Sequence, residues 1–251
     1  MRLRSGFNLS NPLRWGLPLL LAGLLSVGGV TARAAQAPAS TVVSASAITA
    51  GVRETTLPNG LKVLTKEVRN APVVSFSVWY RVGSRNEHTG ITGTSHLLEH
   101  MLFKGTKTRG PGEISRALFI NGASFNASTY YDWTNYYETL ASDRLEMAMQ
   151  IEADRMTNSL IDPKELASEM TVVRSELEGR ENSPSTLLFQ AVAAAAFQAH
   201  PYQWPIIGWR TDVENVPRDA IYAYYKKYYG PNNATMVIVG DFDTEKTLAM
   251  V

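Results

Sequence analysis

Cysteine is absent from this chain of 251 residues, and its absence removes several kinds of site at once. Without a thiol there is no disulfide framework, no thiolate zinc site and no cysteine nucleophile. Lipidation of an N-terminal cysteine is excluded for the same reason.

Neither positive nor negative charge is in excess. Lys and Arg number 24 and Asp and Glu number 23, so the formal net charge is +1. This balance gives no reason to expect nucleic acid or an anionic surface as the partner. The hydrophobic content of 45% and the charged content of 19% are ordinary for a folded globular protein.

Acidic residues are missing from the start of the chain, where none occurs before Glu54. Three arginines, at positions 2, 4 and 14, precede an uncharged, mostly apolar run, "WGLPLLLAGLLSVGGVTA". Ala32 and Ala34 offer the small residues that a signal peptidase reads. We expect a secretory signal peptide over residues 1–34 and an Ala/Ser/Thr-rich linker over residues 35–52. Export to a bacterial periplasm follows, or membrane anchoring if the signal stays uncleaved.

The rest of the chain mixes strand-like and helix-like stretches. A hairpin is expected around Asn59, and a strand pair around Asp132, because turn residues there separate β-branched and aromatic runs. Helices are expected after Asp162 and over residues 218–229, with one beginning at a Thr94 or Ser95 cap, whereas residues 200–217 are expected to be irregular. The mixture predicts an α+β fold, with helices packed on one face of an antiparallel-rich sheet.

Two of the four histidines, His96 and His100, occur in "HLLEH", with Glu99 between them. On a helix, residues four apart share a face, so the two imidazoles can bind one zinc ion. Glu99 can then reach a water that the metal activates and accept its proton. This is the inverted zinc-protease arrangement, H-x-x-E-H. A chance match, or a structural helix whose leucines form a core face, remains the alternative.

A hydrolytic zinc normally has a third protein ligand and one open position. The candidates are histidines elsewhere and the glutamates of the helix that follows Asp162: His88, His200, Glu165, Glu169, Glu176, Glu178 and Glu181. Glu169 and Glu176 are seven residues apart and therefore share a helix face, whereas Glu178 is rotated away from them. For Glu165, Glu178 and Glu181 a solvated helix face is the better interpretation.

The stretch "GSRNEHTGITGTSHLLEHMLFKGT" resembles the pitrilysin-type (insulinase-like) zinc peptidases, in particular the bacterial relatives of the mitochondrial processing peptidase. The resemblance continues through "FNASTYYDWTNYYETL", "EMTVVRSELEGRENSP", "HPYQWPIIGW" and "YYGPNNATMVIVGDF", and covers about residues 53 to 245. It implies an N-terminal zinc-peptidase domain over residues 53–251, with the fold of one half of such a peptidase.

The resemblance also implies roles for individual residues. His96, His100 and Glu176 match the family's zinc ligands, and Glu99 matches its general base. Glu169 matches a carboxylate that supports a ligand histidine and raises its basicity. The edge strand that holds substrate falls on Phe125, Asn126, Ala127, Ser128 and Thr129, where Asn126 and Ala127 would bind the peptide backbone by strand addition. An ordinary edge strand with aromatic packing explains this last segment equally well.

Members of this family enclose substrate between two halves, and the second half supplies an Arg/Tyr pair that holds the substrate carbonyl. The present sequence ends at "GDFDTEKTLAMV" without such a half. We therefore expect a fragment or a chain completed by a separate partner. The leading hypothesis is a zinc endopeptidase acting on extended peptides or unfolded segments. The alternatives are a non-catalytic peptide-binding subunit and a hydrolase of non-peptide amides.

Overall fold

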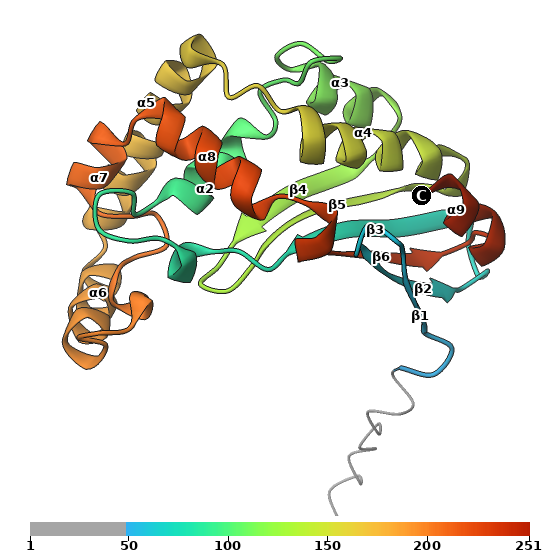
Figure 1. Ribbon diagram of the computed structural model, residues 1–251, viewed down its shortest axis with the longest axis horizontal. Coiled ribbons are helices and arrows are strands. Elements are labelled where there is room, and N and C mark those ends of the chain that lie inside the picture. Colours follow the sequence, from blue (N-terminus) through green and yellow to red (C-terminus); the bar gives the residue numbers. More distant parts are fainter. Residues whose placement is uncertain (1–48) are drawn as a thin grey trace, which may run out of the picture. The chain divides into compact units, whose positions relative to one another are not determined.

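The computed structural model describes residues 49–251 (Figure 1). The predicted signal peptide and residues 35–48 of the predicted linker lie outside the described residues. Within residues 49–251, none of the helices has the length and apolar character needed to cross a membrane.

One mixed sheet of six strands runs through the described part of the chain. Its strand order is β1-β2-β6-β3-β5-β4, and every neighbouring pair is antiparallel except the parallel pair β2 and β6. The predicted antiparallel-rich sheet is therefore confirmed, and β4 forms one of its two edges. The strands are β1 (Arg53–Thr56), β2 (Lys62–Glu67), β3 (Val73–Tyr80), β4 (Ser124–Thr129), β5 (Thr134–Ala141) and β6 (Ala234–Gly240).

Helices cover one face of this sheet, as predicted, and Figure 1 shows α2, α3, α4 and α8 lying above the strands. The helix α2 contacts both α5 and the edge strand β4, so it lies between a long helix and the sheet edge. The helices are α2 (Thr94–Met101), α3 (Glu113–Ile120), α4 (Leu145–Asn158), α5 (Pro163–Glu181), α6 (Pro184–Ala196), α7 (Arg210–Asn215), α8 (Arg218–Tyr228) and α9 (Thr244–Met250).

The central strand β3 shows why the helices pack on that face. Every second side chain of "VVSFSVWY" is fully buried, namely Val74, Phe76, Val78 and Tyr80, while the residues between them are more exposed. Side chains alternate between the two faces of a strand, so this pattern presents one apolar face to the helices. Burying an aliphatic or aromatic side chain contributes about 1.5–3 kcal/mol. The alternation therefore buries four side chains of β3 in the core between the sheet and the helices.

The prediction that residues 200–217 are irregular is wrong in part. This segment contains a short 3-10 turn, Pro201–Gln203, and the helix α7. A helix of one to two turns is unstable by itself and has little apolar periodicity to reveal it. Tertiary contacts stabilise α7, because the buried Asp212 accepts hydrogen bonds from the backbone of Gly90 and from both the backbone and hydroxyl of Thr92.

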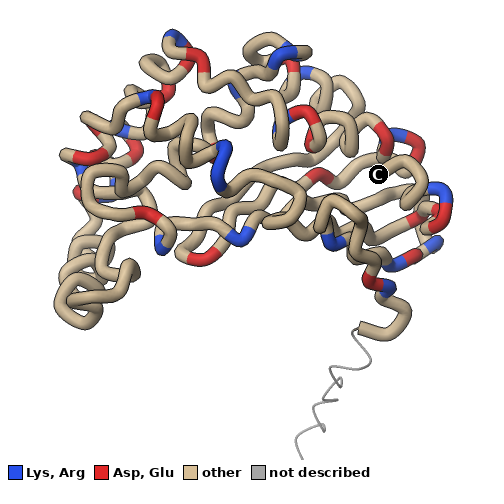
Figure 2. Tube along the Cα trace, in the orientation of Figure 1, with Lys and Arg blue, Asp and Glu red and all other residues tan. Residues whose placement is uncertain are grey.

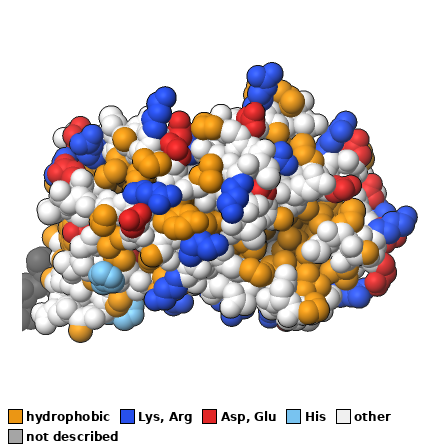
Figure 3. All heavy atoms as spheres, turned by 45° about the horizontal axis from the view of Figure 1, so that its top comes forward, with side chains coloured by type: hydrophobic (Ala, Val, Ile, Leu, Met, Phe, Trp, Pro, Cys, Tyr) orange, Lys and Arg blue, Asp and Glu red, His pale blue; other side chains and the backbone are white. Residues whose placement is uncertain are grey.

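Charged side chains are spread along most of the described chain, but α6 carries none (Figure 2). An apolar hollow lies elsewhere, between α4 and the strands, and is lined by Leu61, Val78, Met149, Met156 and Met236 among others. Figure 3 shows apolar side chains gathered toward this end of the molecule, where α9 lies. The hollow shares no lining residue with the cleft described below.

Candidate metal and catalytic site

The helix that carries "HLLEH" begins in a way that the sequence did not indicate. Its N-cap is Gly93, in a left-handed conformation with φ 88°, and neither Thr94 nor Ser95 is the cap that we expected. The buried Glu87 replaces a cap side chain, since its two carboxylate oxygens accept from the backbone N–H groups of Gly93 and Ser95, each at 2.7 Å. A carboxylate brought from outside the helix therefore satisfies two of the free N–H groups at its start.

Replacing Glu87 with Gln is expected to lower the free energy of unfolding by about 1–3 kcal/mol, because one of the two backbone N–H groups then faces an NH₂ donor in a buried place. Urea denaturation at about pH 9 measures this loss, because burial raises the pKa of Glu87 to about 8 and Gln must be compared with the ionised carboxylate. Glu113→Gln is the matched control, since Glu113 accepts from the backbone N–H of Gly110 at an exposed position. Equal losses in the two variants would contradict the role given to Glu87.

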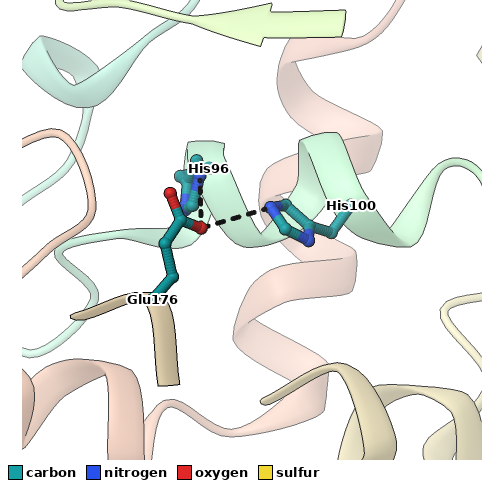
Figure 4. Close-up of side chains that lie close together, drawn as sticks. All are labelled: His96, His100 and Glu176. Atoms are coloured by element: carbon teal, nitrogen blue, oxygen red, sulfur yellow. Dashed lines mark ion pairs between the residues drawn. The ribbon is translucent and has the colours of Figure 1, made fainter. Parts of the chain in front are cut away.

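His96, His100 and Glu176 lie together, although α5 supplies the third residue from far along the chain (Figure 4). The Oε2 atom of Glu176 is 3.6 Å from Nε2 of His96 and 3.9 Å from Nε2 of His100. One ligand atom from each residue lies within 4.8 Å of the other two. The alternative third ligands His88 and His200 are exposed and do not belong to this group.

These three residues fit a zinc ion. Ligand atoms held at the usual zinc distances in a tetrahedron are separated by about 3.4 Å, so the observed separations need only small adjustments. Burial, followed by the charge of His100, lowers the pKa of His96 to about 4. The ring of His96 is therefore neutral at neutral pH and can offer a lone pair, as a metal ligand must.

Glu169 holds the second histidine in place. Its Oε1 atom is 2.9 Å from Nδ1 of His100, and its Oε2 atom pairs with the ammonium group of Lys104 at 2.5 Å. Burial opposes the ionisation of Glu169, but the hydrogen bonds from Lys104 and His100 outweigh it and lower its pKa. An ionised Glu169 accepts the Nδ1 proton of His100 and leaves Nε2 free to face the metal position.

Glu99 lines the same cleft as the three candidate ligands. Its Oε2 atom accepts a hydrogen bond from the hydroxyl of Thr129 at 2.6 Å. Burial raises the pKa of Glu99, which makes its carboxylate a stronger base. We expected Thr129 only as part of a substrate strand, and nothing in the spacing of the sequence indicated that it orients Glu99.

The other residues of the predicted substrate strand divide into two groups. Asn126, Ala127 and Ser128 line the cleft beside the candidate ligands. Phe125 does not line it, and its ring instead packs near Phe103, with the ring centroids 6.3 Å apart. The strand therefore offers its C-terminal part to the cleft, while Phe125 anchors it to the core.

Arg180 is a cleft residue that our interpretation of the sequence missed. Its Nη2 atom donates to Oε1 of Glu176 at 2.9 Å. The signal that could have revealed it is the spacing, since Glu176 and Arg180 form an acid–base pair four residues apart on one helix.

Comparison with known families gives the class of protein to which this fold and site belong. The model of the insulinase family (peptidase family M16) matches residues 62–209, and that of the peptidase M16 inactive domain matches residues 215–251. The chain belongs to the insulinase family of peptidases, M16, whose members are zinc-dependent. The predicted family and the predicted cofactor, zinc, are thus confirmed.

Individual relatives of the chain are zinc proteases by name. The chain is 34% identical to an uncharacterised zinc protease of Mycobacterium leprae, over 80% of this chain and 45% of that protein. It is 34% identical to the zinc protease PqqE of Helicobacter pylori, over 78% of this chain and 44% of that protein. The chain therefore spans less than half the length of these relatives.

Solved structures also match this chain over less than half of their own length. A protease from Helicobacter pylori superimposes with a TM-score of 0.77 at 34% identity, over 79% of this chain and 48% of that one. The first half of the periplasmic protease PqqL from Escherichia coli gives a TM-score of 0.73 at 25% identity, over 80% and 45%. The prediction that the fold is that of one half of such a peptidase is confirmed.

Proposed function

We propose that this chain is the metal-binding half of a zinc endopeptidase that hydrolyses extended peptides or unfolded segments. One observation carries the proposal. A single cleft contains a three-residue set of zinc-type ligands, a partly buried carboxylate on the same helix as the histidines, and the exposed edge of a sheet. Hydrolysis of a peptide needs all three features at one place.

His96, His100 and Glu176 hold the metal in this proposal. The zinc ion supplies Lewis acidity, which lowers the pKa of a nearby water and polarises the scissile carbonyl. Glu99 accepts the proton of the attacking water and later donates it to the leaving amine. The hydroxyl of Thr129 donates to Oε2 of Glu99, so we assign the transferred proton to the other oxygen, Oε1.

The peptide lies along β4 in this proposal. An extended segment can add to a free sheet edge through main-chain hydrogen bonds, and β4 is an edge of the sheet. The backbone N–H of Ala127 already donates to the side-chain Oδ1 of Asn126 at 2.9 Å. An incoming peptide carbonyl would replace this side-chain oxygen, so Asn126 keeps the edge satisfied until substrate arrives.

The opposite wall of the cleft comes from a second half in our proposal. Solved relatives include the first half of a longer periplasmic protease, which supports the expectation that this chain works with another half. That half would bear the Arg/Tyr pair and hold the substrate carbonyl. We further propose export to the periplasm by the signal over residues 1–34.

A non-catalytic, peptide-binding role is the second candidate, because the edge strand β4 beside the cleft can bind an extended peptide whether or not hydrolysis follows. Measurements of zinc binding and of peptide turnover distinguish the catalytic role from the non-catalytic one. The complete protein, with its second half fused or added in trans, should cleave an unfolded peptide and lose this activity to a chelator. Zinc binding without any cleavage by the completed protein would favour the non-catalytic role.

Metal affinity tests the ligand assignment directly. Glu176→Gln should weaken zinc binding strongly, and Glu169→Gln should weaken it by about 10–100-fold, because it supports His100 without being a ligand. Glu178→Gln is the matched control on the same helix, since Glu178 is exposed and faces Arg210 at 3.7 Å. The measurement is competition with a chromophoric chelator, and equal affinities for the Glu176 and Glu178 variants would refute the assignment.

A further inference from the structure

The two oxygens of Glu176 have different partners. Oε2 faces the two histidines, as Figure 4 shows, whereas Oε1 accepts a hydrogen bond from Nη2 of Arg180 at 2.9 Å. Arg180 lies one helical turn beyond Glu176 on α5 and lines the same cleft. Among the described residues, the ion pairs of Arg180 go to Glu176 alone.

We propose that Arg180 is a positioning residue that binds Oε1 of Glu176 and thereby presents Glu176 to the metal through Oε2 only. The inference rests on the proposed function, since it concerns the third ligand of that site. It assigns a role to Arg180 that neither the "HLLEH" motif nor the ligand spacing implies. Arg180 acts through Glu176 and is not itself a ligand, because a guanidinium offers only donors.

The number of oxygens that Glu176 supplies matters for hydrolysis. A catalytic zinc site keeps one coordination position open beside three protein ligands. A carboxylate that binds through both oxygens would crowd that position, and a carboxylate that rotates freely would lose part of its affinity in becoming ordered. A hydrogen bond to Oε1 counters both effects, as hydrogen bonds to ligand carboxylates generally do.

The positive charge of Arg180 affects zinc affinity in the direction opposite to that of its hydrogen bond to Glu176. A guanidinium near a divalent cation repels it, so an Arg180 that contributed only its charge would weaken zinc binding. Removing that charge would then tighten binding, whereas removing a positioning hydrogen bond loosens it. Half of the Arg180 side chain is exposed, with 47% of its surface accessible, and solvent screens the repulsion. The sign of the change in affinity therefore distinguishes the two roles.

The experiment measures zinc affinity of the whole chain by chelator competition for Arg180→Met and Arg180→Lys. Arg174→Met is the matched control, because Arg174 lies on the same helix, is exposed, and within residues 49–251 donates a hydrogen bond only to the hydroxyl of Thr171, at 3.4 Å. We expect Arg180→Met to weaken zinc binding by about 10–100-fold, in the range for residues that orient ligands. The zinc affinity of Arg180→Lys should lie between those of the parent chain and Arg180→Met, and the zinc affinity of Arg174→Met should match that of the parent chain.

A second readout follows the geometry of the site. Substitution of cobalt for zinc gives an absorption spectrum that reports coordination, and Arg180→Met should change this spectrum whereas Arg174→Met should not. Unchanged or tighter zinc binding by Arg180→Met, with an unchanged cobalt spectrum, would overturn the inference and leave the proposed function standing. A parent chain that binds no zinc would overturn both.

Discussion

Replacing Glu99 with Gln is expected to reduce peptide hydrolysis by the completed enzyme about 10²–10⁴-fold, the usual contribution of a general base. Gln fills almost the same volume and can still contact Thr129, but its amide cannot accept the proton of the attacking water. His96, His100 and Glu176 are untouched, so zinc content should stay at the parent level. The measurement is kcat on an unfolded peptide, together with metal analysis of the same sample.

Thr129→Val is the matched variant for this experiment. It removes the hydrogen bond of 2.6 Å to Glu99 but leaves the carboxylate in place, so we expect a smaller loss of kcat than for Glu99→Gln. Turnover at the parent rate by Glu99→Gln would show that another group is the base. Loss of zinc from that variant would show that Glu99 contributes to the metal site itself.

Local periodicity is sufficient to predict that the two histidines of "HLLEH" share one face of a helix. Residues four apart share a helix face, so "HLLEH" alone placed His96 and His100 together, and the structure brings them together. The spacing of Glu169 and Glu176 puts both on one face of the later helix α5 but does not say which of them is the third candidate ligand. That choice came from the resemblance to a known family, because it depends on how α5 crosses α2.

Contacts between distant segments set the limit of the sequence-based prediction. Capping rules consider only side chains next to a helix start, and so they favoured Thr94 or Ser95 over a carboxylate from Glu87. The bond from Thr129 to Glu99 joins a strand to a helix 30 residues away, and no local rule covers it. The sequence indicates that Arg180 can pair with Glu176 one turn away on a helix. Its relevance to the candidate site appears only once the structure places Glu176 beside the two histidines.

The burial of Arg155 is the clearest case of such a limit. Charged residues are rarely fully buried unless paired, and nothing local in α4 marks Arg155 as different from a surface arginine. Its side chain is nevertheless 0% exposed, with Nη2 3.3 Å from Oε1 of Glu152, and its guanidinium lies over the rings of Phe103 and Tyr136 at 4.6 and 4.4 Å. Glu138 is also buried nearby, and burial, followed by the charge of Glu152, raises its pKa well above the ordinary value.

Arg155→Met should therefore lower the free energy of unfolding by about 3–5 kcal/mol, because it leaves two buried carboxyl groups without their cation. The loss should also depend on pH. A carboxyl whose folded pKa is raised stabilises the fold below its unfolded pKa, and this contribution is lost as pH rises through the folded pKa. Arg155 opposes the rise in the pKa of Glu138, so without Arg155 that pKa rises further and the deficit of the variant should grow from acidic toward neutral pH.

Urea denaturation of the parent chain and of Arg155→Met, at about pH 5 and about pH 8, measures both the loss of stability and its dependence on pH. A buried carboxyl group with a raised pKa loses its stabilising contribution as the pH rises between these two values. Arg144→Met is the matched control, because Arg144 stands at the start of the same helix with 52% of its side chain exposed. Adding Glu152→Gln to Arg155→Met should recover part of the loss, since it removes one of the two carboxyl groups left without a cation. If Arg155→Met were no less stable than Arg144→Met at either pH, the guanidinium would not be what makes the buried carboxyl groups tolerable.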